Sequence, residues 1–435
     1  MNVGQTKRKL LIYAHYYTPD VASTGQILRE LAEGLLKKFE VTVFCVVPSY
    51  TGKIAPEYKT QKYYYETING VNVIRIRVPE FDKTDKKSRV KNILAYFFGA
   101  IKLTFRIEKQ DYVFSISQPP VLGGMLGLIG KYIMHSKFIY DVQDFNPEQI
   151  MAVNYSKNRL ILKAMLMVDK YCCAHADKDI VVGRDMIDTL KKRFGNKKVP
   201  MYSCINNWIN EDEIYPLPLS ERHVQEFRRK YNLENKFVFM YSGNLGLYYD
   251  LPNIMKIIRK FRGSVNQEGI TDIGTHTPDG REVAFVFVGE GSVKNELEEY
   301  KRAHHLQNVV FIPYQSREDL VYSLNAADVH MCVSAKGIKG VSVPSKAYGI
   351  MAVAKPILGV MEEGSECGLL VAETRCGLCS TPTDNESLER NIRWFIDNSN
   401  TDTLKRMGKR GREYLENKLS REESLSRYEE EILSC

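Results

Sequence analysis

KFVFMYSGNLG (residues 236–246) joins an apolar run to a turn that carries two glycines. KLLIYAHYY (residues 9–17) begins an earlier block in a similar way, and each stretch is followed by a segment with the apolar spacing of an amphipathic helix. Apolar strands that alternate with helical segments favour crossover connections and a parallel sheet covered on both faces. Two such blocks predict two doubly wound, Rossmann-like α/β domains.

The remaining apolar runs extend this pattern on either side of a polar boundary. NNWINEDEIYPLPL (residues 206–219) carries two prolines and separates the blocks. We predict domains over residues 1–208 and 209–405, followed by highly charged closing helices over 406–435 that pack back toward the first domain. A surface loop is expected over 263–282. The other expected elements are a helix at 25–39 and strands at 41–47, 71–78, 111–117, 137–143, 283–289, 308–314, 329–334 and 355–360.

Composition is that of a soluble globular protein, with 44% hydrophobic and 26% charged residues. No apolar run is long enough for a spanning helix, and the N-terminus does not have the pattern of a signal peptide. The nine cysteines form no regular framework, which indicates free thiols in a reducing cytoplasm. Cys376 and Cys379 leave open half a zinc site or a redox pair.

Basic residues are concentrated in the first half of the chain. Residues 1–205 contain 32 Lys and Arg against 19 Asp and Glu. This excess suggests an anionic partner such as phospholipid headgroups, a lipid pyrophosphate or nucleic acid, with a generic basic surface as the alternative. Nucleic acid is the weakest of these, because the basic residues are not interleaved with aromatic ones. The apolar segments 92–107 and 119–134 are candidates for helices on a bilayer surface, or else for core helices.

Two segments of the first block follow strands at positions where doubly wound sheets bind ligands. In PDVASTGQ (residues 19–26), Thr24 and Gly25 can offer backbone N–H groups to an anion, or Ser23 or Thr24 can simply cap the helix. In YDVQDFNPE (residues 140–148), Asp141 and Asp144 should face opposite sides of an extended strand. Asp144 is the carboxylate expected to project into the cleft, with helix capping as its alternative.

The second block carries the most informative motif. Gly243 and Asn244 form a turn that lets a phosphate approach the backbone, although this motif is weak by itself. GIKGVSVPSKAY (residues 337–348) then places a glycine-rich loop before a helix that is expected to have Pro344 as its first residue. A lysine in the first turn is unfavourable for the helix dipole unless an anion is bound. We therefore predict a donor-phosphate site at Ser345 and Lys346, with a solvated lysine as the alternative.

With these motifs in place, the chain resembles a known family. The order HYYTPDVASTGQ, DVQDFNPE, CINNW, YSGNLG, FIPYQSREDL and VPSKAYGIMAVAKPIL is similar to bacterial family 4 glycosyltransferases of the GT-B fold. The resemblance covers nearly the whole chain and is strongest to the group that acts in capsule, O-antigen and exopolysaccharide assembly. A subgroup shares the PSK-x-Y-G motif. The resemblance implies two Rossmann-like domains that face a central cleft, with the acceptor bound by residues 1–208 and the nucleotide sugar by residues 209–405.

The resemblance also implies roles for individual residues. Asp144 and Lys346 would be catalytic, with Asp144 beside the reacting sugar and Lys346 on the diphosphate. No metal or cofactor is implied beyond the nucleotide sugar itself. The residues implied in donor binding are Gly25, Gly243, Asn244, Tyr314, Gln315, Gly340, Ser345 and Glu366.

Two departures from the family pattern concern the donor site. The family's two glutamates, seven residues apart, are absent between Val341 and Gly349. Glu366 is our candidate for the ribose contact that the second of them normally makes. The basic residue that usually follows the glycine turn is also missing from YSGNLGLYYD, which leaves more of the phosphate charge to Lys346.

The sequence thus predicts an enzyme, a hexosyl- or N-acetylhexosaminyl-transferase. It would move a sugar, with retention, from a UDP-sugar to a polyprenyl-diphosphate-linked saccharide in surface polysaccharide biosynthesis. We expect it in the cytoplasm, peripheral on the anionic inner face of the cell membrane. A nucleotide-sugar epimerase or hydrolase and a non-catalytic nucleotide-sugar-binding subunit are the alternatives. The sugar, the base, the anomeric outcome, the acceptor and the oligomeric state are not fixed by the sequence.

Overall fold

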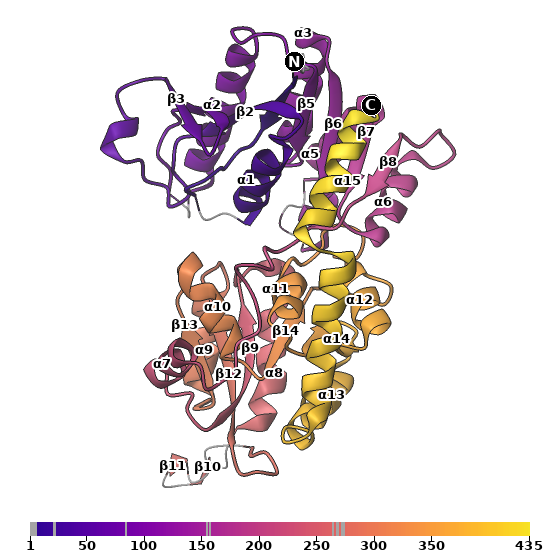
Figure 1. The fold of residues 1–435 in the computed structure, drawn as a ribbon. Coiled ribbons are helices and arrows are strands. Elements are labelled where there is room, and N and C mark those ends of the chain that lie inside the picture. The colour runs from indigo at the N-terminus through magenta and orange to yellow at the C-terminus, as the bar shows by residue number, and fades with distance from the viewer. Residues whose placement is uncertain are drawn as a thin grey trace, which may run out of the picture. The chain divides into compact units, whose positions relative to one another are not determined.

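The computed structural model describes residues 7–20, 23–82, 85–153, 155, 158–262, 265–266, 269–270 and 275–435. The chain forms two compact units, each an α/β layer structure around one largely parallel sheet (Figure 1). The first unit comprises residues 1–151, 156–206 and 422–435, and the second comprises residues 152–155 and 207–421. The prediction of two Rossmann-like α/β domains is confirmed.

The first unit has an eight-stranded sheet in the order β3-β4-β2-β1-β5-β6-β7-β8. Its strands are parallel except for the edge strand β3, which pairs antiparallel with β4. Its elements are β1 (Arg8–Tyr13), α1 (Ser23–Leu35), β2 (Phe39–Val46), η1 (Pro56–Tyr58), β3 (Tyr63–Ile68), β4 (Val71–Ile76), α2 (Lys86–Thr104), β5 (Tyr112–Ile116), α3 (Leu122–Met134), β6 (Lys137–Val142), α4 (Glu148–Ala152), α5 (Arg159–His175), β7 (Lys178–Val181), α6 (Arg184–Phe194), β8 (Tyr202–Cys204) and α15 (Arg421–Leu433).

The strand order places the helices of the first unit on two faces. From β1 the chain moves one way to β2, whereas the connections through α2, α3 and α5 move the other way. Right-handed crossovers in opposite directions lie on opposite faces, so α1 covers one face and α2, α3 and α5 cover the other. The C-terminal helix α15 packs on the α1 face, where Tyr428 contacts the ring of Phe114 and Leu425 lies against Gly34.

The second unit has a six-stranded sheet in the order β13-β12-β9-β14-β15-β16, with all its strands parallel. A small antiparallel pair, β10 and β11, lies apart from this sheet. Its elements are α7 (Arg222–Lys230), β9 (Lys236–Ser242), η2 (Leu247–Tyr249), α8 (Leu251–Ile258), η3 (Arg259–Phe261), β10 (Val265–Asn266), β11 (Gly269–Ile270), β12 (Glu282–Val288), α9 (Lys294–Ala303), β13 (Val309–Ile312), α10 (Arg317–Asn325), β14 (Val329–Val333), α11 (Lys346–Ala352), β15 (Ile357–Val360), α12 (Glu366–Thr374), β16 (Gly377–Ser380), α13 (Asn385–Asp397) and α14 (Asp402–Lys418).

Several expected boundaries differ from the observed ones. The helix expected at 25–39 is α1, which begins earlier and ends at Leu35, because Phe39 already starts β2. The expected start of the closing segment at residue 406 falls inside α14. That helix belongs to the second unit, whereas α15 from Glu422 onward and the last two residues belong to the first. Of the loop expected at 263–282, residues 263–264, 267–268 and 271–274 lie outside the described residues.

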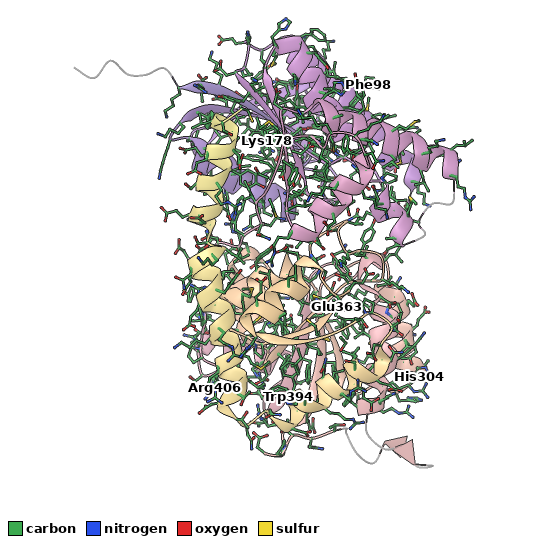
Figure 2. The ribbon with its side chains drawn as sticks, turned by 90° about the vertical axis from the view of Figure 1, so that its right-hand side faces the viewer. Phe98, Lys178, His304, Glu363, Trp394 and Arg406 are labelled. Atoms are coloured by element: carbon green, nitrogen blue, oxygen red, sulfur yellow. The ribbon has the colours of Figure 1, made fainter. Side chains whose placement is uncertain are left out.

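The two apolar segments of the first unit have different environments. In α3 the glycines pack directly on the sheet, and a Cβ at Gly127 would lie 2.0 Å from the Phe138 ring. This helix therefore has a core face, as the alternative interpretation of 119–134 held. In α2, Phe98 remains 62% exposed although its neighbour Phe97 is buried (Figure 2). Throughout the described residues, all helices are too short or too polar to cross a membrane. All nine cysteines are free thiols.

Candidate donor and acceptor sites

In the second unit, two glycine turns meet at the carboxyl edge of the sheet. Strand β9 lies between β12 and β14, which is where the order of the strands reverses and where doubly wound sheets bind ligands. Gly243 follows β9 with φ +137°, and Gly289 follows β12 with φ +141°. A Cβ on Gly289 would lie 2.0 Å from the Gly243 carbonyl oxygen, so the backbones of the two turns are in direct contact. The Tyr241 hydroxyl donates to the Asn244 carbonyl (2.7 Å) and fixes the first turn.

Lys346 reaches this junction from the start of α11. A Cβ on Gly243 would lie 2.6 Å from Lys346 Cε, so a larger residue would displace the lysine side chain from this position. The Lys346 ammonium lies 3.7 Å from the Tyr249 ring centroid and 5.0 Å from that of Tyr241. These are cation–π distances. Lys346 has no ion pair with any described residue, so its charge is held by aromatic faces and remains uncompensated by a carboxylate.

The glycine-rich loop before α11 is held by Glu362. One oxygen of this carboxylate accepts from the backbone N–H groups of Gly337 (2.8 Å) and Lys339 (3.2 Å). The Lys339 ammonium donates to the carbonyl of Glu363 (2.6 Å). Some of the N–H groups that a phosphate would use in such a loop are therefore bound by the protein's own acid.

The predicted residues around α11 take specific positions. Ser345 is the N-cap residue and is exposed, and Gly340 lies in the preceding turn with φ +71°. The expectation that Pro344 is the first helical residue is wrong, because the helix begins at Lys346. Glu366, our candidate for the ribose contact, is the first residue of α12 and only 1% exposed. Its carboxylate is thus enclosed by protein rather than presented on the surface.

Tyr314 and Gln315 follow β13 at the same edge of the sheet. The Tyr314 hydroxyl donates to the Glu290 carbonyl (3.3 Å), and its ring lies against Gly289. The Gln315 amide donates to the Pro313 carbonyl (2.7 Å). The second unit therefore brings Gly243, Lys346 and Tyr314 close together, while Gln315 follows Tyr314 in a half-buried position.

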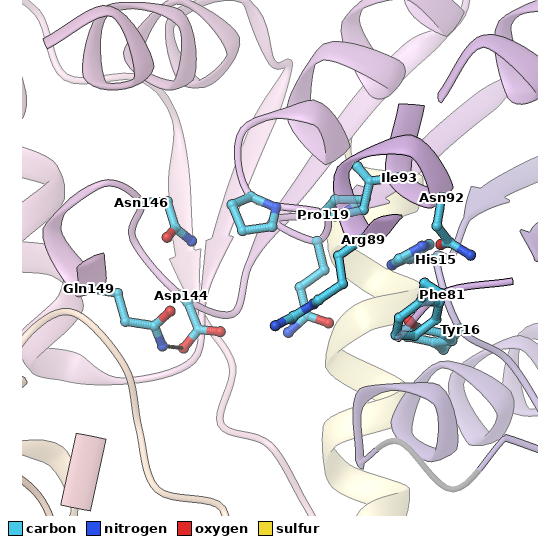
Figure 3. A pocket seen from close by; sticks show the side chains of 12 residues that line it. His15, Tyr16, Phe81, Arg89, Asn92, Ile93, Pro119, Asp144, Asn146 and Gln149 are labelled. Carbon is cyan, nitrogen blue, oxygen red and sulfur yellow. Dashed lines mark hydrogen bonds between the residues drawn. The ribbon is translucent and has the colours of Figure 1, made fainter. Parts of the chain in front are cut away.

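The first unit has a pocket of about 220 Å³ at the carboxyl edge of its own sheet. The pocket lies where the strand order reverses between β1 and β5. Arg89 reaches into it from α2, whereas Asp144 and Gln149 line it from the segment after β6 (Figure 3). The other lining residues are His15, Tyr16, Phe81, Asn92, Ile93, Gln118, Pro119, Pro120 and Asn146.

Asp141, near the end of β6, and Asp144, just after it, have separate environments. Asp144 lines the pocket, and its carboxylate accepts from the Gln149 amide (2.9 Å). Asp141 is buried and accepts from the Gln143 amide (2.7 Å) and the Tyr428 hydroxyl (3.4 Å). Burial raises the pKa of Asp141 to about 7. Asp144 is thus the carboxylate that a ligand in the pocket can contact.

Arg193 on α6 holds the segment that carries Asp144. Its guanidinium bonds to the Glu148 carboxylate at 2.7 and 2.8 Å and to the Asn146 carbonyl at 2.9 Å. Its third partner is the buried carboxylate of Asp169 at 2.6 Å. Four charge-assisted bonds from one rigid fork fix residues 146–148 relative to α5 and α6.

Burial also perturbs two aromatic groups of the pocket. It lowers the pKa of His15 to about 4, so the imidazole is neutral at neutral pH and can act as an uncharged hydrogen-bond partner. Burial, aided by Asp20, raises the pKa of Tyr16 to about 12. Gly25 is not among the residues that line this pocket. A Cβ on Gly25 would lie 3.3 Å from the Tyr16 carbonyl oxygen. The hydroxyl of its neighbour Thr24 donates to the Gln118 side-chain carbonyl (3.1 Å).

Three residues of these sites were not singled out from the sequence. Tyr249 supports Lys346, Arg89 supplies the pocket's guanidinium, and Glu362 holds the glycine-rich loop. The sequence offered a signal for Tyr249 alone. It is an aromatic residue in YSGNLGLYYD, the stretch that lacks the family's usual basic residue.

Comparisons with known proteins identify relatives of the C-terminal part and of nearly the whole chain. Residues 223–414 match the family model described as Glycosyl transferases group 1. WbjE of Pseudomonas aeruginosa, which is named as a glycosyltransferase, is 27% identical over 72% of this chain and 74% of its own. WcaI of Escherichia coli, named for colanic acid biosynthesis, is 23% identical over 98% of this chain and 99% of its own.

Solved glycosyltransferase structures share the fold at low sequence identity. Sucrose-phosphate synthase of Thermosynechococcus elongatus has a TM-score of 0.74 at 14% identity and covers 97% of both chains. HepE of Anabaena, solved with UDP and glucose, has a TM-score of 0.70 at 13% identity, over 98% of this chain and 100% of that one. Residues 223–414 thus carry a glycosyl transferases group 1 domain, in a chain that has the GT-B fold and is similar over its whole length to a protein named a glycosyl transferase.

Proposed function

We propose that the protein transfers a sugar from a UDP-sugar to a hydroxyl of a lipid-linked saccharide in surface polysaccharide biosynthesis. Lys346 is the observation that carries this proposal. It is half-buried beside two glycine turns and has no ion pair with a described residue. A cation placed where backbone can approach a ligand closely is suited to a diphosphate.

The proposed donor and acceptor draw on different observations. HepE, with the same fold, was solved with UDP-glucose, and we propose a UDP-linked hexose or N-acetylhexosamine here. We assign the acceptor sugar to the pocket of the first unit. Its volume of about 220 Å³ is below that of sites for drug-sized ligands, and its charged and amide side chains suit sugar hydroxyls. The name of WcaI supports a polysaccharide pathway. A polyprenyl diphosphate as the carrier would place the enzyme at the cytoplasmic face of the membrane.

In the proposed reaction, negative charge develops on the departing diphosphate. Lys346 stabilises this charge, and the aromatic rings beside it preorganise the ammonium before the donor binds. We propose retention of configuration, with a donor phosphate oxygen accepting the acceptor's proton and with Asp144 beside the reacting sugar. This route has no protein nucleophile, and no metal or other cofactor takes part in it.

Incubation of the purified chain with labelled UDP-sugars and a membrane lipid fraction tests the proposal. We expect label to enter the lipid fraction. Release of an altered free sugar would instead indicate an epimerase or hydrolase, and binding without turnover a non-catalytic subunit.

Lys346→Ala should lower turnover about 100-fold or more, by analogy with the loss of one preorganised donor to a developing anion. Lys405→Ala, an exposed lysine on α14 of the same unit, is the matched control and should be unchanged. Wild-type turnover in Lys346→Ala would contradict the assigned role.

A further inference from the structure

Helix α2 carries an apolar stripe on the side that faces away from its sheet. Val90, Leu94 and Phe98, together with Phe105 directly after the last helical residue, are 40–69% exposed. Their spacing of three to four residues, or multiples of it, puts them on one side of the helix. The sheet side is occupied by other residues, among them Gly99, where a Cβ would lie 2.6 Å from Ile76. The residues of the stripe are therefore not part of the hydrophobic core of the unit.

Helix α5 repeats this arrangement. Leu160, Met167 and Tyr171 follow one another at helical spacing on its outer side and are 52–81% exposed, while Leu162 and Cys173 are buried. Between α2 and α5 lies α3, which packs against both and exposes Tyr132. We call the outward sides of these three helices the apolar face. Exposed apolar residues in this number on adjacent helices are typical of an interaction surface.

The solvent-facing charges on these three helices are all positive. Helices α2 and α3 contain no acidic residue, and the single acid of α5, Asp169, is buried against Arg193. By contrast, α1 and α15, on the other side of the sheet, carry several glutamates. The exposed basic residues on the three helices include Lys87, Lys91, Lys102, Arg159 and Lys163.

We propose that the apolar face docks onto an anionic phospholipid bilayer. Apolar side chains flanked by lysines on a helix surface enter the boundary between headgroups and acyl chains, while the lysines meet the phosphates. The same charge pattern disfavours a second copy as the occupant, since two such faces would bring lysine against lysine. None of the described helices spans a membrane, so attachment would be at the surface.

Docking by this face would also orient the pocket of the first unit. Arg89, Asn92 and Ile93 line the pocket, and Val90 and Leu94 of the same two turns belong to the apolar face. One helix thus links the membrane contact to the pocket within about one helical turn. The docking itself does not depend on the proposed sugar transfer. Only its use, the capture of a lipid-linked acceptor, rests on that function.

Sedimentation of the purified full-length protein with vesicles tests the docking directly. We expect binding to phosphatidylcholine vesicles that contain phosphatidylglycerol, weak binding to phosphatidylcholine alone, and partial release by high salt. Lys87→Glu with Lys91→Glu should weaken binding about tenfold or more. Phe98→Ser with Leu160→Ser should weaken it similarly, and the residual binding should be more sensitive to salt.

Two controls keep the result specific to the apolar face. Met201→Ser removes an apolar side chain of matched exposure (64%) outside the three helices, and Lys405→Glu reverses an exposed charge in the second unit. Both should bind vesicles like the wild type, and the melting temperatures of all variants should stay close together.

Equal binding by the face variants and the wild type would overturn the proposal. It would also be overturned if the wild type ignored vesicles and instead formed a dimer that Phe98→Ser with Leu160→Ser dissociates. Transfer to a short, soluble acceptor should be unchanged in the face variants, which separates this result from a failure of the proposed enzyme activity.

Discussion

The ammonium of Lys346 lies 3.7 Å from the centre of the Tyr249 ring. A larger residue in place of the neighbouring Gly243 would displace the lysine side chain. Tyr249 in turn meets Tyr241 edge to face at 5.9 Å. The lysine charge therefore lies against two aromatic rings, Tyr241 of β9 and Tyr249 of η2, which we call the aromatic platform.

Replacing Tyr249 with leucine should raise the KM for the donor several-fold. The leucine keeps the apolar contact but loses the cation–π attraction, worth about 0.5–2 kcal/mol, that orients Lys346 before the donor arrives. Initial rates against donor concentration measure the effect. Leu247→Ala, in the same turn but exposed, should leave the KM unchanged, and an equal rise in both variants would argue against the platform.

Gly243→Ala should lower donor affinity and destabilise the second unit by about 1–3 kcal/mol. The new methyl would combine a strained φ of +137° with a 2.6 Å approach to Lys346 Cε. Gly280→Ala is the matched control, because its φ is +80° but its Cβ would meet nothing within 4 Å. Chemical unfolding and donor-induced thermal shifts compare the two. Equal loss of donor affinity would mean that backbone strain rather than contact with Lys346 is responsible.

Arg193→Met should destabilise the first unit by about 3–5 kcal/mol, because the buried carboxylate of Asp169 would lose its cation. Calorimetry should show the transition of this unit moving down while that of the second unit stays in place. Lys192→Met, the exposed neighbour, provides the control. A surviving fold with lowered turnover and normal donor binding would identify Arg193 as a positioning residue for Asp144.

Asp141→Asn should flatten the pH dependence of stability. The folded pKa is raised by burial to about 7 from 3.8, so the native carboxyl keeps its proton while the unfolded chain loses it. The free energy of unfolding then falls as pH rises between about 4 and 7, by at most about 1.4 kcal/mol per pH unit. Asparagine is nearly isosteric with the neutral acid. Denaturant unfolding at about pH 5 and pH 8 measures the effect. The free energy of unfolding of the variant relative to that of the wild type should be higher at pH 8 than at pH 5, and a constant difference would contradict the prediction.

Much of the fold follows from the sequence because buried parallel strands are nearly continuous apolar runs. VTVFCVV and VAFVFVG became β2 and β12 for this reason. Edge and short strands carry no such signal. The edge strand β3 is half-exposed along its length and contains polar residues, and β8 has three residues. The sequence also could not assign α14 and α15 to different units, since both are charged helices of similar pattern.

The candidate site was predictable only where one local motif contained it. Lys346 follows from its conflict with the helix dipole, and Gly243 from its turn after β9. Their direct contact requires the β9 and β14 strands to be neighbours, which no local pattern encodes. Arg89 shows the same limit. It is an ordinary basic residue just before the apolar segment 92–107 until the sheet places it beside the strand ends after β1 and β5.

The return of α15 to the first unit has a consequence for synthesis on the ribosome. The second unit is nearly continuous in sequence and can close its sheet once residue 421 has emerged. The first unit begins to emerge earlier but still lacks Tyr428, whose ring covers Phe114 and whose hydroxyl bonds to Asp141. The half of the protein that is made first is therefore completed last. Until then, its sheet exposes the groove that α15 will fill, and this is the interval in which a chaperone would matter most.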